Sequence, residues 1–386
     1  MKIQVAGLWI VDCRLLIEKL TDCGSKISFL SGIARIKSFS VPSTQYPVPN
    51  SLGFRRIYQK VPSILKDNRG FALILTILIV SLVVVLTLQF NNSMWSDLYS
   101  SANLRDGIRL RFIARSGVDC ALAVLSEDSS SSDFDSLKET WANSKELSLN
   151  SVTMFENGHF QVEISDLCGK IQVNRLINQD GKYNETQKKL LMRLLISEQF
   201  QLDSGEVGNL IDAIKDWIDP DDDVTRFGAE NGYYQSLENP YSCKNGPIES
   251  LGQMLLIKGV TKDLFYGNEH GPGISNYLTV YGDGKININT ADPLVLRSLS
   301  DDLDTKMVND MIEYRLDEGN DLKDPGWYRK VAGVGDAAIE SGLIKTASPY
   351  FEIESAGISG PMNKRVAAII KREGEKSIQV LAWKVE

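Results

Sequence analysis

The chain has 386 residues, enough for two or three domains, and its 43% hydrophobic and 24% charged residues are typical of a folded protein rather than a disordered one. Its net charge of −8 is unevenly distributed. Residues 1–70 carry 11 Lys+Arg and 4 Asp+Glu, a net of +7, which leaves 31 and 46 for residues 71–386, a net of −15. The acidic part lacks the basic surface on which most nucleic-acid binding depends.

Residues 71–90 contain no charged side chain and follow directly after Arg69 and Gly70. Twenty helical residues at about 1.5 Å each span about 30 Å, the thickness of the hydrocarbon core of a bilayer. Because only a helix satisfies its own backbone in lipid, we predict a transmembrane helix. The basic side of such a helix stays in the cytoplasm, so the acidic part is expected across the membrane, in the periplasm if the host is a bacterium.

The helix is expected to continue to about residue 125, because apolar residues recur at helical spacing and no proline interrupts them. The polar run SEDSSSSDFDS, residues 126–136, is then a linker. Residues 1–65 show no domain-like periodicity. We interpret them as the result of a start assigned too far upstream, with a genuine cytoplasmic extension as the alternative.

Alternating apolar residues predict strands at both ends of the acidic part. Strands are expected within 151–174, with Asn157-Gly158 as a hairpin turn, and at 350–357, 364–372 and 378–385. Between them, apolar residues recur at helical spacing in 185–200, 204–218, 292–299 and 304–316. This order predicts an α+β fold in which a helical domain is inserted into a sheet.

The cysteines lie on both sides of the apolar run: Cys13 and Cys23 before it, and Cys120, Cys168 and Cys243 after it. Three cysteines in an oxidising compartment allow one disulfide. We favour Cys168–Cys243 because Cys120 falls in the predicted helix, and the other pairings stay open. The chain has no C-x-x-C pair to support zinc or thioredoxin-like chemistry.

The segment DWIDPDDDVTRFGAE, residues 216–230, holds five Asp and one Glu. If Asp219 is position 1 of a calcium loop, acidic residues also fall at positions 3, 5 and 12, which supply ligands in such loops. Position 6, normally Gly, is Val224, so the match is partial, and a solvated acidic turn is the alternative. Asp216 and Asp222 are weaker candidates. The predicted ligands are Asp219, Asp221, Asp223 and Glu230.

An enzymatic function has little support in this sequence. After the apolar run there are only two histidines, His159 and His270, and neither a Gly-x-Ser-x-Gly motif nor a phosphate-binding glycine loop. A site made of paired carboxylates remains the alternative. We therefore predict a protein that is not an enzyme.

A basic leader that ends in Gly, followed by Phe and a spanning helix that runs into a soluble domain, resembles a type IV pilin-like precursor. The resemblance implies that prepilin peptidase cleaves between Gly70 and Phe71 and methylates the new amino terminus. Most pilins have Glu at the fifth mature position, where this chain has Leu75. A subunit without this carboxylate would be a poor repeating unit but a possible filament tip.

Five motifs, in order, look like the K-type minor pseudopilin of the type II secretion system, also called the general secretion pathway protein K family. They are DLCGKIQVN, LIDAIKDWIDPDDD, GAENGYYQ, IESLGQMLLIKGVTKDLF and GKININTADPLVLRSL. The match covers about residues 69–386. It implies a pilin-like antiparallel sheet with a large inserted helical domain of the helix-hairpin-helix or SAM-like type. It also implies a leader at 1–70, an anchor helix at 71–126, sheet at 127–174, the insert at 175–347 and the last strands at 348–386.

The resemblance also implies a function and partners. Such a subunit caps the tip of a periplasmic pseudopilus with the I- and J-type minor pseudopilins and supports protein export across the outer membrane. It is anchored once in the inner membrane, where it meets the other pseudopilins and the secretion platform, and its head lies in the periplasm. K-type relatives bind calcium, which supports a structural calcium ion in the 216–230 loop.

An alternative function is a pilus-associated role in DNA uptake. Residues 286–319, followed by 328–336, resemble a tandem helix-hairpin-helix module, in which glycine-rich turns bind phosphate through backbone N–H groups. The first turn carries Asp301, Asp302 and Asp304 where glycine is wanted, and only residues 331–335 keep the glycine pattern. With the net charge of −15, this departure makes nucleic-acid binding the less favoured function.

Overall fold

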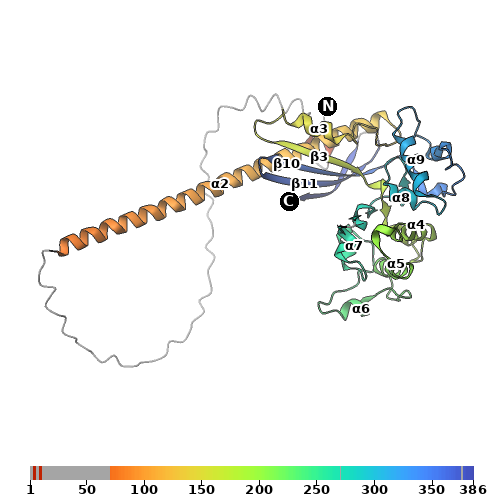
Figure 1. The fold of residues 1–386 in the computed structure, drawn as a ribbon, viewed down its shortest axis with the longest axis horizontal. Helices are drawn as coiled ribbons and strands as arrows, with labels where there is room; N and C mark the ends of the chain where they lie inside the picture. Colours follow the sequence, from red (N-terminus) through yellow and green to blue (C-terminus); the bar gives the residue numbers. More distant parts are fainter. Residues whose placement is uncertain (1–2, 6–7, 11–69, 270, 375–376) are drawn as a thin grey trace. The chain divides into compact units, whose positions relative to one another are not determined.

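The structure, a computed structural model, describes residues 3–5, 8–10, 70–269, 271–374 and 377–386. The chain forms two compact units, Arg14–Asp106 and Met1–Cys13 with Gly107–Glu386. The second unit contains the sheet and the helical insert (Figure 1) and a short hairpin of β1 (Ile3–Val5) and β2 (Leu8–Ile10). The predicted leader lies almost entirely outside the described residues.

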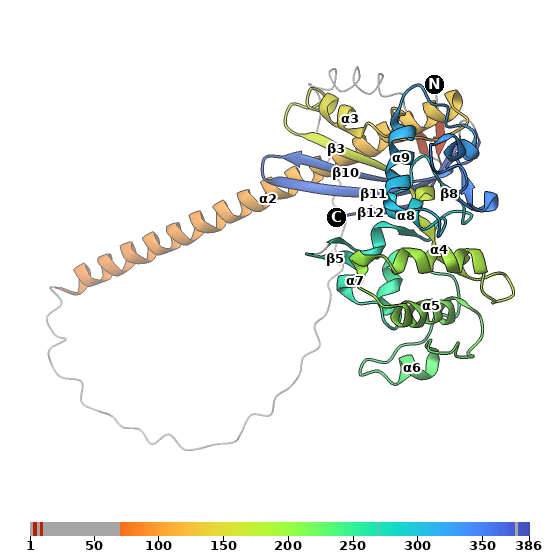
Figure 2. The same ribbon diagram turned by 45° about the vertical axis from the view of Figure 1, so that its right-hand side comes forward.

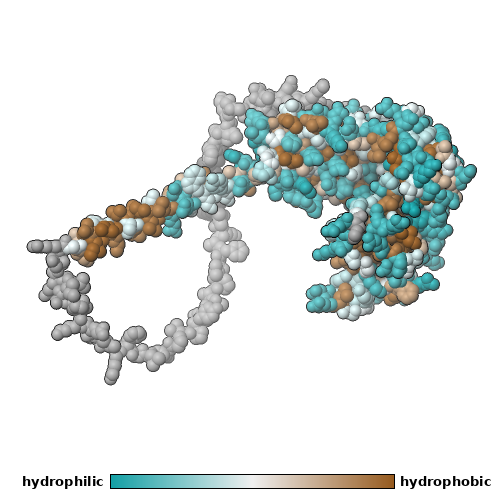
Figure 3. All heavy atoms as spheres, viewed as in Figure 1, coloured by the Kyte–Doolittle hydropathy of each residue, from teal (hydrophilic) through white to brown (hydrophobic). Residues whose placement is uncertain are grey.

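Helix α2 (Phe71–Ser131) contains the whole of the predicted apolar helix. Its first twenty residues are exposed, and Figure 3 shows the brown, apolar end of the helix that they form. Within the described part of the chain, α2 is the helix that is long and apolar enough to cross a membrane. The helix also takes in the start of the predicted linker, where the Ser130 hydroxyl donates to the carbonyl of Ser126 one turn earlier.

Beyond Gly107, α2 packs on one face of an antiparallel sheet. The strand order is β12 (Ile378–Val385), β11 (Met362–Arg372), β10 (Tyr350–Ser359) and β3 (His159–Asp166). Two glycines allow the helix to lie this close, because a Cβ on Gly357 would collide with the Leu110 carbonyl and one on Gly117 with the Ser355 hydroxyl. The predicted C-terminal strands and the α+β class are confirmed.

Helix α3 (Ser144–Ser151) covers the outer edge of β3. The Ser148 hydroxyl accepts a hydrogen bond from Val162 N at 3.0 Å, and the Ser151 hydroxyl accepts one from Phe160 N at 3.1 Å. These hydroxyls satisfy edge groups that a further strand would otherwise pair with. The predicted hairpin turn at Asn157-Gly158 is therefore wrong, because the segment before it contains helix α3 and a turn rather than a strand.

The helical insert lies between β3 and β10 and has its own apolar core, separate from the core between α2 and the sheet. Its helices are α4 (Glu185–Leu195), α5 (Ser204–Ile218), α6 (Asn231–Gln235), α7 (Lys262–Tyr266), α8 (Pro293–Arg297) and α9 (Thr305–Leu316). Its short strand pairs are β4 (Ile171–Gln172) with β7 (Leu278–Thr279), β5 (Gly267–Asn268) with β6 (Gly271–Pro272), and β8 (Ile286–Asn287) with β9 (Ile344–Lys345). In Figures 1 and 2, α6 lies at the end of the insert farthest from the sheet.

Candidate cation site

Helix α5 positions the first two side chains of the site. Asp203 caps the amino end of the helix in a reciprocal capping box, and the helix ends at Ile218 because Pro220 cannot continue it. Asp219 is the first residue beyond the helix, and Asp216 lies three positions earlier. Residues three apart on a helix share a face, so both carboxylates emerge on the same side.

Three carboxylates meet in the loop that joins α5 to α6. Oxygen atoms of Asp216, Asp219 and Glu230 all lie within 4.8 Å of one another. The three residues are 0%, 0% and 2% exposed. The loop closes tightly over them, because a Cβ on Gly228 would collide with Asp216 Oδ2. The sequence therefore brings three negative groups into one buried place.

Much of this negative charge has no hydrogen-bond partner. Asp216 accepts from Thr225 N through both oxygens at 3.1 Å, but Asp219 Oδ1 and both oxygens of Glu230 find no donor among the described residues. Burial, reinforced by the charge of Asp216, raises the pKa of Glu230 to about 8. Buried carboxylates without partners cost free energy, and a hard divalent cation with oxygen ligands removes that cost. The three residues therefore fit calcium.

One positive side chain reaches the cluster from α5. Lys215 Nζ is paired with Asp219 Oδ2, donates to Thr225 Oγ1 at 2.9 Å and lies 4.0 Å from Asp216 Oδ1. The lysine side chain is only 13% exposed. It therefore compensates part of the charge of the cluster from within the protein.

The structure brings together two of the four predicted ligands, Asp219 and Glu230. Asp221 and Asp223 are exposed and lie outside the cluster, where Asp221 Oδ1 accepts from Asp223 N at 3.0 Å. Asp216, a weaker candidate in the sequence, takes the third place. In this structure the loop does not bring all four residues of the predicted calcium-loop spacing together. The sequence did contain a signal for Asp216: it lies three positions before Asp219, a spacing that places both side chains on one helix face.

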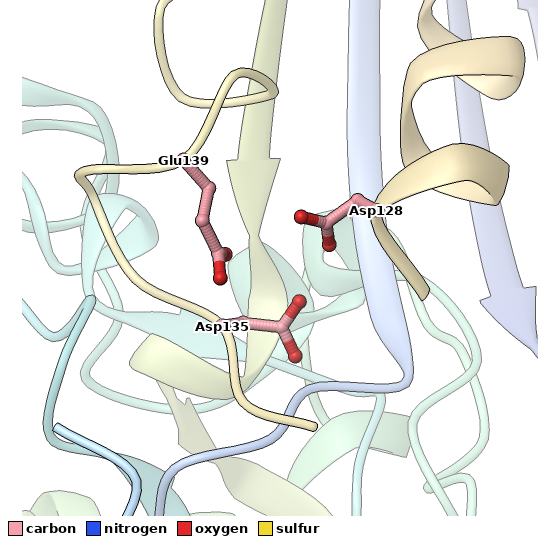
Figure 4. A group of neighbouring side chains, drawn as sticks. All are labelled: Asp128, Asp135 and Glu139. Atoms are coloured by element: carbon pink, nitrogen blue, oxygen red, sulfur yellow. The ribbon is translucent and has the colours of Figure 1, made fainter. Parts of the chain in front are cut away.

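A second acidic cluster lies near the end of α2. Asp128, Asp135 and Glu139 point toward one another (Figure 4), with oxygens within 4.8 Å. Arg372 of β11 pairs with both aspartates, through Nη1 to Asp128 at 3.0 Å and through Nη2 to Asp135. Glu139 accepts hydrogen bonds from the Ser136 backbone at 2.9 Å and the Trp141 indole at 2.8 Å. Protein groups thus compensate this cluster, and it makes a poor cation site.

The same region joins the insert to the sheet through buried hydrogen bonds. Asp135 Oδ2 accepts from Ser348 N at 2.6 Å, and Asp166 Oδ2 accepts from the Ser348 hydroxyl at 2.6 Å and from Asn287 Nδ2 at 3.0 Å. These residues come from four distant parts of the chain. No local spacing in the sequence indicates such a network.

Cys168 and Cys243 are separate buried thiols, so the structure contradicts the favoured disulfide. Cys168 lies in the turn after β3, where its backbone N–H donates to Asp166 Oδ1 at 2.7 Å. Cys243 lies beside the cation site, and its thiol donates to the Asp216 carbonyl at 3.5 Å. The two cysteines are anchored at different positions in the insert, which the counting of cysteines could not reveal.

The aspartates of the predicted first hairpin hold the insert together. Asp301 pairs with Arg193 at 2.6 Å, Asp302 accepts from Ala338 N at 3.0 Å, and Asp304 caps α9 by accepting from Met307 N at 2.7 Å. A phosphate at this turn would meet negative charge. The structure therefore gives these carboxylates a structural explanation and adds nothing in favour of DNA binding.

The chain is similar in sequence to protein K of the type II secretion system. Residues 169–267 match a family model described as "Type II secretion system (T2SS), protein K". The chain is 26% identical over 235 residues to "Type II secretion system protein K" of Aeromonas hydrophila and 24% identical over 234 residues to the protein of the same name of Klebsiella pneumoniae. Each match covers 58% of this chain and 67% of the relative.

A solved structure has the same fold. It is a chain of the crystal structure of the GspK-GspI-GspJ complex of the type 2 secretion system from enterotoxigenic Escherichia coli. The TM-score is 0.58 at 16% sequence identity, and the match covers 75% of this chain and 99% of that one. At this identity the likeness shows the fold, which here is the sheet with its helical insert.

Proposed function

We propose that this chain belongs to the type II secretion system protein K family of minor pseudopilins and that its head caps the tip of a periplasmic pseudopilus to support protein export. The observation that carries the proposal is the insert between β3 and β10, a second body with its own apolar core on a pilin-like sheet. A subunit of this kind would obstruct the next subunit in a repeating fibre. Leu75, apolar where most pilins carry Glu, supports the same conclusion.

The position in the fibre can be tested directly. Isolated pseudopili would be labelled with gold-conjugated antibody against the insert and examined by electron microscopy, with a major pseudopilin labelled in parallel. Gold is expected at one end of each fibre for this protein and along the whole length for the control. Gold along the fibre for this protein would overturn the tip assignment.

We further propose that the chain is cleaved between Gly70 and Phe71 by prepilin peptidase and methylated at Phe71, and that its head lies in the periplasm. Gly70 directly precedes α2, so cleavage there would leave the apolar helix at the new amino terminus. Intact mass and amino-terminal sequencing of the protein from membranes of a host with active peptidase should give methylated Phe71. A mature protein that retains residues before Phe71 would contradict this processing.

The proposed partners are the I- and J-type minor pseudopilins, which share a complex in the matching crystal structure, and more loosely the other pseudopilins and the inner-membrane secretion platform. The fold that this chain shares with that structure supports the proposal. Co-expression of tagged I- and J-type subunits from the same genome should give a complex of one copy of each by size-exclusion chromatography with light scattering. Elution of this chain apart from both subunits would refute the assignment.

We also propose that the head binds a structural calcium ion. Asp216, Asp219 and Glu230 would hold it, and it would supply positive charge to the buried oxygens that lack donors. No reaction is involved, and the ion would fix the loop between α5 and α6. Isothermal titration of the full chain in detergent should show saturable calcium binding that Glu230→Gln removes. The absence of saturable binding by the wild type would contradict the proposal.

A further inference from the structure

We propose that Lys215 is an internal counter-ion of the cation site, which lowers the affinity for cations and sets the preference for divalent over trivalent ions. The inference rests on the proposed calcium site and goes beyond it, because it assigns a role to a residue that is not a ligand. It starts from one observation: a lysine whose side chain is 13% exposed is paired with one of the three carboxylates that would hold the cation.

The geometry places the lysine at the site while leaving other carboxylate oxygens of the cluster without a donor in the described part of the chain. Lys215 Nζ is held by Asp219 Oδ2 and by Thr225 Oγ1 at 2.9 Å, on the side of the cluster formed by α5. Asp219 Oδ1 and both Glu230 oxygens remain without donors among the described residues. The ammonium therefore satisfies one carboxylate oxygen and leaves the others available to a ligand.

The charges indicate what that ligand is. With a cation bound through ionised ligands, Asp216, Asp219 and Glu230 contribute three negative charges and Lys215 one positive charge. A divalent ion then makes the buried cluster neutral, whereas a trivalent ion leaves one positive charge in a place where an uncompensated charge is costly. Without the lysine, a trivalent ion would give the neutral cluster instead. Charge count and site rigidity tune cation affinity in oxygen-ligand sites generally.

A neighbouring lysine provides a matched control. Lys258 also holds this loop, because its Nζ donates to the carbonyls of Phe227 at 3.1 Å and Gly228 at 3.0 Å. It pairs with backbone carbonyls rather than with the carboxylates of the site. Replacing Lys258 therefore weakens the loop without removing the counter-ion.

The test compares the wild-type chain with Lys215→Met, Lys215→Arg and Lys258→Met, each full length in detergent. Calcium affinity would be measured by isothermal titration, and terbium affinity by luminescence sensitised through Trp217, the buried indole beside Asp216. Removing a positive charge this close to the ion should tighten calcium binding by roughly tenfold or more. It should tighten terbium binding further, so that the terbium-to-calcium affinity ratio rises.

The variants separate this role from a purely structural one. Lys215→Met should lower the thermal stability of the cation-free protein while it raises cation affinity, whereas loss of a structural contact lowers both. Lys215→Arg should keep the wild-type ratio, and Lys258→Met should not raise affinity. Calcium binding by the wild type with unchanged or weaker binding by Lys215→Met would overturn the counter-ion role and leave the calcium proposal standing. If neither protein bound calcium or terbium, both proposals would fail.

Discussion

The two acidic clusters of this protein have nearly the same composition and opposite chemistry. Asp128, Asp135 and Glu139 share an arginine and hydrogen bonds from the protein, so this cluster is complete without a ligand. The Asp216, Asp219 and Glu230 cluster has one lysine, and several of its buried oxygens lack donors. Proximity of carboxylates therefore does not define a cation site. We propose that the number of carboxylate oxygens left without a donor distinguishes the cluster that binds a cation from the one that does not.

The difference follows from what each cluster joins. The Arg372 cluster lies near the end of α2 and connects it to the last strands, a permanent part of the fold. The other cluster closes a loop within the insert, between α5 and α6. The protein compensates the first cluster completely, and it leaves the second with buried oxygens that lack donors among the described residues. The following experiments break or sharpen this contrast.

The largest effect is expected from Arg372→Met at pH 8. The change would leave Asp128 and Asp135 buried without their cation, and breaking a buried pair in this way costs about 3–5 kcal/mol of unfolding free energy. Denaturant unfolding measures it. Lys371→Met is the matched control, because Lys371 pairs with Glu373 at the surface and its loss should leave the unfolding free energy nearly unchanged. A loss for Arg372→Met no larger than that of the control would refute the account of this cluster.

Calcium should stabilise the protein through one cluster and not the other. At a concentration of a hundred times the dissociation constant, a ligand bound only by the folded state adds about 2.7 kcal/mol. Thermal unfolding with and without calcium measures this gain. Glu230→Gln should remove it, and Asp135→Asn should leave it intact. If Asp135→Asn lost the calcium stabilisation and Glu230→Gln kept it, the ion would lie at the Arg372 cluster and our assignment would be wrong.

The pH dependence should also distinguish the clusters. Burial raises the pKa of Asp135 to about 7, although Arg372 opposes the shift. The folded state therefore keeps a proton that the unfolded state loses near pH 4, so this group makes stability fall as the pH rises from about 4 to 7. Wild type should lose about 2 kcal/mol relative to Asp135→Asn between pH 5 and 8. Parallel stability profiles of the two proteins would rule out the shift.

The smallest effect is expected from Asp221→Asn and Asp223→Asn. Both side chains are exposed and lie outside the cluster, so each should weaken calcium binding by less than about threefold through long-range charge alone. Titration at 0.15 M salt measures it, with Asp219→Asn as the comparison. A loss as large as that of Asp219→Asn would restore the calcium-loop ligand set predicted from spacing.

The sequence by itself determined the elements whose signals are local. A charge-free run of helix-spanning length gave α2, apolar alternation gave β10, β11 and β12, and helical spacing gave α5 within its observed bounds. Two of the ligands predicted from the sequence, Asp219 and Glu230, also lie in the buried carboxylate cluster. These features depend on neighbours within a few positions, where periodicity and charge can be read directly.

Only the tertiary structure decided which side chains face one another. Asp216 joins the site because α5 turns it toward Glu230, while Asp221 and Asp223 lie outside it. The segment before Gly158 contains helix α3 rather than a strand. The hydroxyls of Ser148 and Ser151 accept hydrogen bonds from backbone N–H groups at the edge of β3. Likewise, Arg372 pairs with Asp135, although more than 200 residues of sequence separate them. Such pairings depend on packing between distant segments, and local spacing carries no record of them.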